Sequence, residues 1–225
     1  RNSQALTLRD FLRIMEASFW RQKWEDNDIA FHQDDANPAL VKHFDALGLQ
    51  SGTRVFVPLC GKTRDIHWLL SKGFRVAGAE LSKVAVAQLF SDLQVNPKVS
   101  AIGPLEHFSA ENIDIYVGNL FDLSKELLGP IDAVYDRAAL VALPSKTRAR
   151  YTAHITGTTN AAPQLLICYV YDQGVMDGPP FSISDEELRH HYQGIYNLTH
   201  VASEDVADGL KGLCPAKENT WLLQQ

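Results

Sequence analysis

The sequence predicts an α/β protein built on a mostly parallel sheet with helices on both faces. From about residue 50 onward, short β-branched runs alternate with helical patterns, which is typical of a parallel sheet covered by helices. The runs Val55–Val57 and Leu165–Tyr171 are apolar at every position, as central strands buried on both faces require. The 225 residues are about one and a half usual domain lengths. We therefore expect a single domain over residues 1–225, with a cover segment at 1–45 and an α/β core at 46–225.

Strands and helices of the core are marked by local signals. Five short β-branched runs are predicted as strands: Arg54–Leu59, Phe74–Glu80, Ile113–Val117, Ile131–Tyr135 and Gln164–Tyr171. A helix over Asp65–Lys72 ends at Gly73, because glycine adopts the left-handed conformation that closes helices. Ser82 is the N-cap of a second helix that runs to about Leu93, and Ser145 begins a third.

The pattern changes after the fifth strand. Asp177–Pro180 is a loop of strong helix and strand breakers. A capping box at Ser184 opens a helix through His191. Tyr196–Val201 and Thr220–Leu223 are then predicted as two closing antiparallel strands.

Charge, hydropathy and cysteine content exclude several classes of protein. The chain has 21 Lys plus Arg against 27 Asp plus Glu, a net charge of −6, which leaves no surplus to bind a nucleic acid. Its longest apolar run, Leu165–Tyr171, is far shorter than the roughly 20 residues that a membrane span needs. Cys60, Cys168 and Cys214 are odd in number and form no C-x-x-C pair, which argues against a metal site and favours a reducing cytoplasm.

The turn after the first strand, Val57–Thr63, is the place to look for a ligand, because α/β sheets bind ligands at the carboxyl ends of their strands. Its Gly-Lys-Thr resembles the end of a phosphate-binding P-loop, but the first glycine of that motif would fall at Phe56, inside the strand. The dinucleotide motif G-x-G-x-x-G fails as well, since only Gly61 is present. The turn therefore suits a ligand without phosphates.

The second strand ends at Glu80, about 20 residues beyond the turn, where nucleoside-binding α/β proteins hydrogen-bond ribose. A carboxylate can accept from both hydroxyls of an unphosphorylated ribose. The alternative is that Glu80 only precedes the Ser82 N-cap and interacts with the helix dipole. Combined with the one-glycine turn, the ribose interpretation is favoured. It indicates an adenosine-like ligand without a 2′-phosphate, of which S-adenosylmethionine is the common example.

Six segments then carry a resemblance to a known family. They are Phe19–Trp24, Ile29–His32, Val57–Lys62, Gly78–Ser82, Asp136–Pro144 and Gly178–Ser182. In order and spacing they resemble the thiopurine S-methyltransferase family, closest to its bacterial members, over about residues 15 to 223. The resemblance implies a class I methyltransferase fold with an N-terminal helical cover and a seven-stranded sheet ordered 3-2-1-4-5-7-6. It also implies methyl transfer from S-adenosylmethionine to a thiol, a thiolate or a related selenium or tellurium species.

The resemblance assigns roles to individual residues. Matched by motif, the cofactor-binding residues are Trp24, Leu59, Glu80, Asn119, Leu120 and Arg137. Phe31 is implied as an aromatic residue that faces the substrate. Two positions depart from the family pattern: Ala30 stands where glycine is usual, and Asn119 where bacterial members often have Asp. An asparagine still offers an acceptor and donors, so the second change affects one hydrogen bond rather than the activity.

Arg137 and Cys60 each have a competing interpretation. The Arg137 guanidinium is suited to a carboxylate of the cofactor or an anionic substrate atom, and the alternative is an ion pair with Asp136. Cys60 in the cofactor turn is interpreted as a small apolar residue, not as a nucleophile. The basic cluster of Lys146, Arg148 and Arg150 is interpreted as a helix surface, or as an attractor of anionic substrates.

Methyl transfer from a sulfonium is an in-line displacement, so no catalytic acid or base is predicted once the nucleophile is a thiolate. Alignment alone can contribute about 7–11 kcal/mol. An amphipathic segment, Leu6–Trp24, precedes Phe31 and would cover the site and exclude water. Trp20 and Trp24 are four residues apart and share one helix face, which is equally the pattern of a core stripe.

The sequence thus favours a monomeric enzyme that methylates small thiols such as thiopurines. Two alternatives stay open: a halide or thiol methyltransferase of the same fold, and a non-catalytic module that binds the cofactor. The aromatic cover and Arg137 speak against the second alternative, because a bare binding module would not need them.

Overall fold

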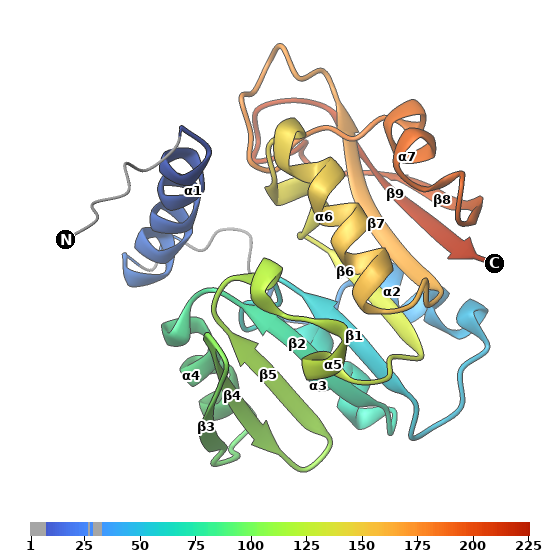
Figure 1. The fold of residues 1–225 in the computed structure, drawn as a ribbon. Helices are drawn as coiled ribbons and strands as arrows, with labels where there is room; N and C mark the ends of the chain where they lie inside the picture. The colour runs from blue at the N-terminus through green and yellow to red at the C-terminus, as the bar shows by residue number, and fades with distance from the viewer. Residues whose placement is uncertain (1–7, 27, 29–32) are drawn as a thin grey trace.

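The computed structural model describes residues 8–26, 28 and 33–225, and its centre is one nine-stranded sheet (Figure 1). The strands are β1 (Arg54–Pro58), β2 (Arg75–Glu80), β3 (Lys98–Ile102), β4 (Leu105–Ala110), β5 (Ile113–Val117), β6 (Ala133–Arg137), β7 (Gln164–Tyr171), β8 (Asn197–Asp205) and β9 (Ala216–Gln224). They lie in the order β3-β4-β5-β2-β1-β6-β7-β9-β8. The central strands β5, β2, β1, β6 and β7 are parallel, and the outer ones are antiparallel.

Without the β3–β4 hairpin, the strand order is the one that the family resemblance implies. Numbered along the chain, the seven remaining strands run 3-2-1-4-5-7-6. The α/β class, the five core strands and the antiparallel closing pair are therefore confirmed, and the sheet has nine strands where seven were expected. The hairpin escaped prediction because β3 is a short edge strand that is almost wholly exposed. The Gly103-Pro104 dipeptide between β3 and β4 is typical of a turn and could have indicated the hairpin.

Two layers of helices cover the two faces of the sheet (Figure 1). One layer holds α2 (Pro38–His43), α3 (Arg64–Ser71) and α4 (Lys83–Asp92), and the other holds α5 (Lys125–Leu128), α6 (Ser145–Thr158) and α7 (Asp185–Tyr192). Strand side chains alternate between these layers: Val55 and Val57 join the first core, while Phe56 between them joins the second. The all-apolar sequence of β1 follows directly from its burial on both sides.

The expected capping residues begin the helices. Ser82 accepts a hydrogen bond from the backbone of Ala85 at 3.2 Å, and Ser184 accepts one from Glu187 at 3.1 Å. Thr63, the last residue of the Gly-Lys-Thr sequence, caps α3 in the same way. This threonine therefore serves the helix, in agreement with the exclusion of a P-loop.

Helix α1 (Leu8–Glu25) lies outside both helix layers, and its second half lines a cavity at the carboxyl ends of the strands (Figure 1). The amphipathic segment expected before the core is therefore confirmed as a helix from Leu8 onward. None of the helices in residues 8–26, 28 and 33–225 is long and apolar enough to cross a membrane.

Candidate functional site

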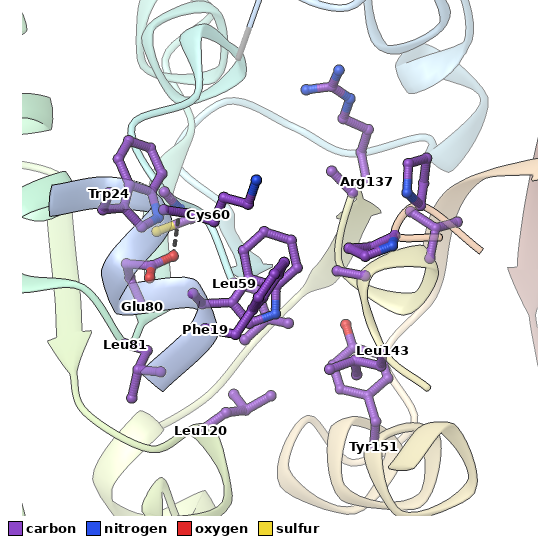
Figure 2. Close-up of a pocket in the computed structure, with 18 of the residues that line it drawn as sticks. Phe19, Trp24, Leu59, Cys60, Glu80, Leu81, Leu120, Arg137, Leu143 and Tyr151 are labelled. Carbon is purple, nitrogen blue, oxygen red and sulfur yellow. Dashed lines mark hydrogen bonds between the residues drawn. The ribbon is translucent and has the colours of Figure 1, made fainter. Parts of the chain in front are cut away.

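A cavity of about 920 Å³ opens at the carboxyl ends of β1, β2, β5, β6 and β7, beneath α1. In the sheet, β1 lies between β2 and β6: the chain continues from β1 to β2 on one side and later returns to β6 on the other side. The cavity therefore lies at the point where the strand order reverses. Figure 2 shows Glu80 and Trp24 on one side of this cavity and Arg137 and Tyr151 on the other. Its volume is in the range of sites for small molecules.

The turn after β1 adopts a constrained backbone conformation. Leu59 has a φ of 47° and Gly61 a φ of 51°, both in the left-handed region that costs non-glycine residues energy. The Cys60 amide donates to the Ala79 carbonyl at 3.0 Å and so ties the turn to the end of β2. A Cβ atom at position 61 would lie 2.8 Å from the Trp24 ring. Only glycine therefore fits between the turn and the indole.

Trp24 belongs to the site. Its side chain is 4% exposed and lies against Gly61 at the cavity wall. Trp20, one helical turn earlier, also lines the cavity. Both tryptophans therefore line the cavity, and Trp20 is only half-buried, which does not fit a core stripe. Their role as a cover stays a prediction. Phe31, expected to face the substrate, lies outside the described residues.

Glu80 lines the cavity and also forms hydrogen bonds to the backbone around it. Its Oε2 accepts from the Gly61 amide at 2.8 Å, and its Oε1 accepts from the Ser82 amide at 2.8 Å. Burial raises the pKa of this carboxyl, while its backbone donors oppose the shift. The side chain therefore links the turn to the start of α4. The contact with α4 agrees with the alternative interpretation, and the bond to the turn was missed. Each oxygen retains acceptor capacity for a ligand hydroxyl.

Asn119 and Leu120 lie beside Glu80 on the next strand end. The Gly118 amide donates to the Glu80 carbonyl at 2.9 Å. Asn119 Oδ1 accepts from the Phe121 amide at 3.0 Å and caps a short 3₁₀ helix, Leu120–Asp122. Its amide nitrogen is the group left for a ligand. Leu120 is buried at the cavity wall, so both positions predicted from the family motif lie in the site.

Arg137, the last residue of β6, faces the opposite side of the cavity from Glu80 (Figure 2). The alternative of an ion pair with Asp136 is wrong, because adjacent strand residues point to opposite faces of the sheet. Asp136 instead accepts from the Leu140 amide at 3.1 Å and the Tyr151 hydroxyl at 2.7 Å. The carboxylate nearest to Arg137 is Asp65, whose Oδ2 lies 4.0 Å from Nη1.

Sequence reasoning also missed several polar side chains around Arg137. Asp65 accepts from the Asn37 amide at 2.7 Å and from the Tyr135 hydroxyl at 3.0 Å. Asp65, Tyr135 and Tyr169 all line the cavity. Tyr135 could have been predicted, because it is two residues before Arg137 on the same strand and therefore faces the same side of the sheet.

The basic cluster on α6 is only partly a solvated surface. Arg148 is buried and its Nε lies 2.6 Å from Glu187 Oε1 of α7, so the surface prediction is wrong for this residue. The reason is that Arg148 joins two packed helices. The guanidinium of Arg150 lies 3.8 Å from the centre of the Phe121 ring, which itself lines the cavity. Lys146 is exposed as expected.

Cys60 has the properties of a packing residue. Its side chain is buried at the turn, and burial, assisted by the negative charge of Glu80, raises the pKa of the thiol well above its ordinary value. A thiol that stays protonated is a poor nucleophile. The interpretation of Cys60 as a small apolar residue is therefore supported.

Asp136 predicts a pH dependence of stability. Burial raises its pKa from 3.8 to about 6 in the folded protein. The folded state thus holds this proton more tightly than the unfolded state does, so the contribution of Asp136 is full below pH 4 and is lost as pH rises through 6. We expect the free energy of unfolding of wild type, relative to Asp136→Asn, to fall by about 3 kcal/mol between pH 4 and pH 7.

Urea unfolding of both proteins at several pH values measures this difference. A constant difference between wild type and Asp136→Asn across this range would contradict the raised pKa.

The cavity fits S-adenosylmethionine. The turn at Gly61 leaves room beside an indole, the Glu80 carboxylate can accept ribose hydroxyls, and Arg137 offers a cation to a carboxylate. The turn carries the single glycine that a phosphate-free ligand needs. Trp24 and Leu59 complete one wall.

Solved structures with the same fold are methyltransferases. The 1,6-didemethyltoxoflavin-N1-methyltransferase of Burkholderia thailandensis, solved with S-adenosylhomocysteine, superposes with a TM-score of 0.65 at 16% identity over 100% of this chain and 94% of that one. A methyltransferase dependent on S-adenosylmethionine from Anabaena variabilis superposes with a TM-score of 0.61 at 14% identity, over 93% and 95% of the two chains. The fold and the site define a class I methyltransferase that uses S-adenosylmethionine.

Sequence comparison gives the family. The model of the thiopurine S-methyltransferase family matches residues 15–224, and the chain belongs to this family. The thiopurine S-methyltransferase of Xanthobacter autotrophicus is 52% identical over 94% of this chain and 100% of its own length. That of Gluconobacter oxydans is 48% identical over 91% and 93% of the two chains. The resemblance stated from the sequence motifs is confirmed.

Proposed function

We propose that this protein transfers a methyl group from S-adenosylmethionine to the sulfur of thiopurines or other small thiols. The observation that carries the proposal is one cavity in which the turn at Leu59–Gly61, Glu80 and Arg137 meet beneath the aromatic side chains of α1. Membership in the thiopurine S-methyltransferase family supports the same substrate class.

The residues of the cavity have distinct tasks in this reaction. Trp24, Leu59, Glu80, Asn119 and Leu120 would hold the cofactor along the β1, β2 and β5 strand ends. When bound, the cofactor supplies an electrophilic methyl group on a sulfonium. The protein aligns the thiol sulfur with that group, and orientation of this kind contributes about 7–11 kcal/mol.

Arg137 and the aromatic residues of α1 would stabilise charged groups of the substrate and the cofactor. The Arg137 guanidinium is placed to meet a carboxylate or an anionic sulfur at the far wall of the cavity. Faces of Trp20 and Trp24 would favour a nearby sulfonium by about 0.5–2 kcal/mol each and keep water out. No side chain needs to form a covalent bond to the substrate.

Further details extend the proposal. Phe31 would face the substrate, and residues 1–45 would cover an α/β core at 46–225 within one domain. The protein would act as a cytoplasmic monomer, and selenium or tellurium species would be accepted as alternative nucleophiles.

An assay of methyl transfer from labelled cofactor tests the proposal against a panel of thiopurines, aliphatic thiols, chloride, bromide, iodide, selenite and tellurite. We expect turnover with the thiopurines and the aliphatic thiols. Turnover with halides alone would show a halide methyltransferase. Cofactor binding without turnover of any acceptor would show a non-catalytic module. Either result would contradict the proposed function.

Cofactor binding is expected to be independent of divalent metals. The described residues contain no group of three His, Cys, Asp or Glu side chains arranged to hold a metal ion. Calorimetric titration with S-adenosylhomocysteine should therefore give a micromolar dissociation constant that is the same with and without EDTA. Loss of binding on chelation, restored by a divalent cation, would show that the site has been misassigned.

A further inference from the structure

A row of polar side chains crosses three strands behind the Arg137 wall of the cavity. Tyr169 of β7 is directly opposite Glu218 of β9 in the antiparallel register. Arg137 of β6 is opposite Ile167, two residues before Tyr169. Because side chains alternate along strands, Arg137, Tyr169 and Glu218 fall on the same face of the sheet. Tyr169 lines the cavity, whereas Glu218 is not among the residues of its lining.

The charges in this row are unbalanced. Arg137 Nη1 lies 4.0 Å from Asp65 Oδ2, and the negative charge of Glu218 also acts on the guanidinium. One cation therefore faces two carboxyl groups. A thiolate brought to Arg137 would add a further negative charge in a partly buried place, where like charges interact strongly. Protonation of one of these carboxyl groups would remove the added negative charge.

Glu218 is the member suited to take up that proton. Burial raises its pKa, and the Arg137 charge opposes this shift. The charge of Glu204 on β8 raises the pKa of Glu218 further, although Glu204 is itself paired with Lys42 at 2.7 Å. Asp65 and Tyr135 also act on the charge of Arg137, and Lys62 and Lys211 are further charged residues in the cavity lining. Tyr169 lines the cavity and is directly opposite Glu218 in the strand register, so it is the residue that connects this carboxyl to the cavity.

We propose that Tyr169 and Glu218 form a proton acceptor for thiol substrates that reach the cavity un-ionised, an inference that rests on the proposed function. The substrate S–H gives its proton to the Tyr169 oxygen while the Tyr169 hydroxyl passes its own proton to the Glu218 carboxylate. The resulting thiolate, stabilised by Arg137, forms a bond to the methyl carbon as the bond from that carbon to the sulfonium sulfur breaks. Glu218 later releases its proton to solvent.

The acidity of the substrate distinguishes this role from a structural one. At a fixed pH, thiols with a pKa above the assay pH need a proton acceptor, whereas thiols that are already ionised do not. Glu218→Gln and Tyr169→Phe should therefore lower kcat/KM roughly tenfold or more for weakly acidic thiols, and change it less than about twofold for ionised ones. Glu218→Asp should restore part of the loss.

Glu106→Gln is the matched control, because Glu106 is a partly exposed carboxylate on β4, near the opposite edge of the sheet, and is paired with Lys83. It should leave both classes of thiol unaffected. An equal loss for all thiols in Glu218→Gln and Tyr169→Phe would overturn the proposal. Absence of methyl transfer to any thiol by wild type would instead defeat the proposed function, so the two failures are distinguishable.

Proton counting provides a readout that does not depend on turnover. An aromatic thiol is titrated into protein saturated with S-adenosylhomocysteine, its thiolate is followed by ultraviolet absorbance, and proton release is measured calorimetrically in two buffers of different ionisation enthalpy. Wild type should show the thiolate band without proton release, because Glu218 retains the proton. Glu218→Gln should either release one proton for each thiolate bound or bind the neutral thiol. Full proton release by wild type would overturn the proposal.

Discussion

Replacing Glu80 by alanine is expected to weaken binding of S-adenosylhomocysteine by about 1–3 kcal/mol, which corresponds to a factor of about 5 to 150. Two losses combine in this variant. The ribose hydroxyls lose their acceptor, and the Gly61 and Ser82 amides lose the carboxylate oxygens that now lie 2.8 Å from each. Calorimetric titration measures the affinity, and thermal unfolding without ligand measures how much of the change comes from the turn itself.

Glu80→Gln separates the two effects. Glutamine has the same shape and keeps one acceptor oxygen, so it can preserve one of the two backbone hydrogen bonds. It should fall between wild type and Glu80→Ala in both affinity and stability. If Glu80→Ala lost stability but bound S-adenosylhomocysteine as tightly as wild type, Glu80 would only connect the turn to α4.

Removal of residues 1–32 is expected to reduce methyl transfer by orders of magnitude and to weaken cofactor binding, while the α/β core stays folded. Trp24 lies against Gly61, and Phe19, Trp20 and Lys23 also line the cavity. Without this cover the cavity is open to water, which weakens alignment and electrostatic stabilisation of the displacement. Steady-state kinetics and circular dichroism of the truncated protein measure the two outcomes.

A point variant tests the same cover with a smaller change. Trp24→Ala should lower cofactor affinity, whereas Glu25→Ala, an exposed position of α1 outside the cavity, should not. Hydrogen exchange should show new protection around Trp24 when S-adenosylhomocysteine binds. Near-full turnover by the truncated protein, or equal exchange in both states, would show that α1 does not close over the cofactor.

Features determined by neighbouring residues were predictable from the sequence. Ser82 and Ser184 cap helices through backbone groups three residues away, so the sequence pattern contains the whole interaction. The positions of Leu59 and Glu80 in the site followed from the rule that ligands bind at strand ends. The edge hairpin was missed because β3 has only five residues and buries almost nothing, so it carries little apolar signal.

Contacts between distant residues were not predictable in the same way. Asp65 and Tyr135 are 70 residues apart and meet only because α3 and the Tyr135 side chain of β6 lie on the same face of the sheet. The same holds for Tyr169 and Glu218, which are brought together by the antiparallel register of β7 and β9. The lack of an ion pair between Arg137 and Asp136 could have been predicted, because neighbouring residues of a strand point to opposite faces of the sheet.

The most direct test of the account is the fate of the methyl group. Protein supplied with S-adenosylmethionine carrying a ¹³C-labelled methyl group and with 6-mercaptopurine is followed by NMR, with heat-denatured protein as the blank. Enzyme-dependent growth of an S-methyl resonance of the purine, in step with S-adenosylhomocysteine, is the predicted result. A labelled methyl group on a ring nitrogen, or a tightly bound cofactor with no transfer to sulfur, would contradict the account.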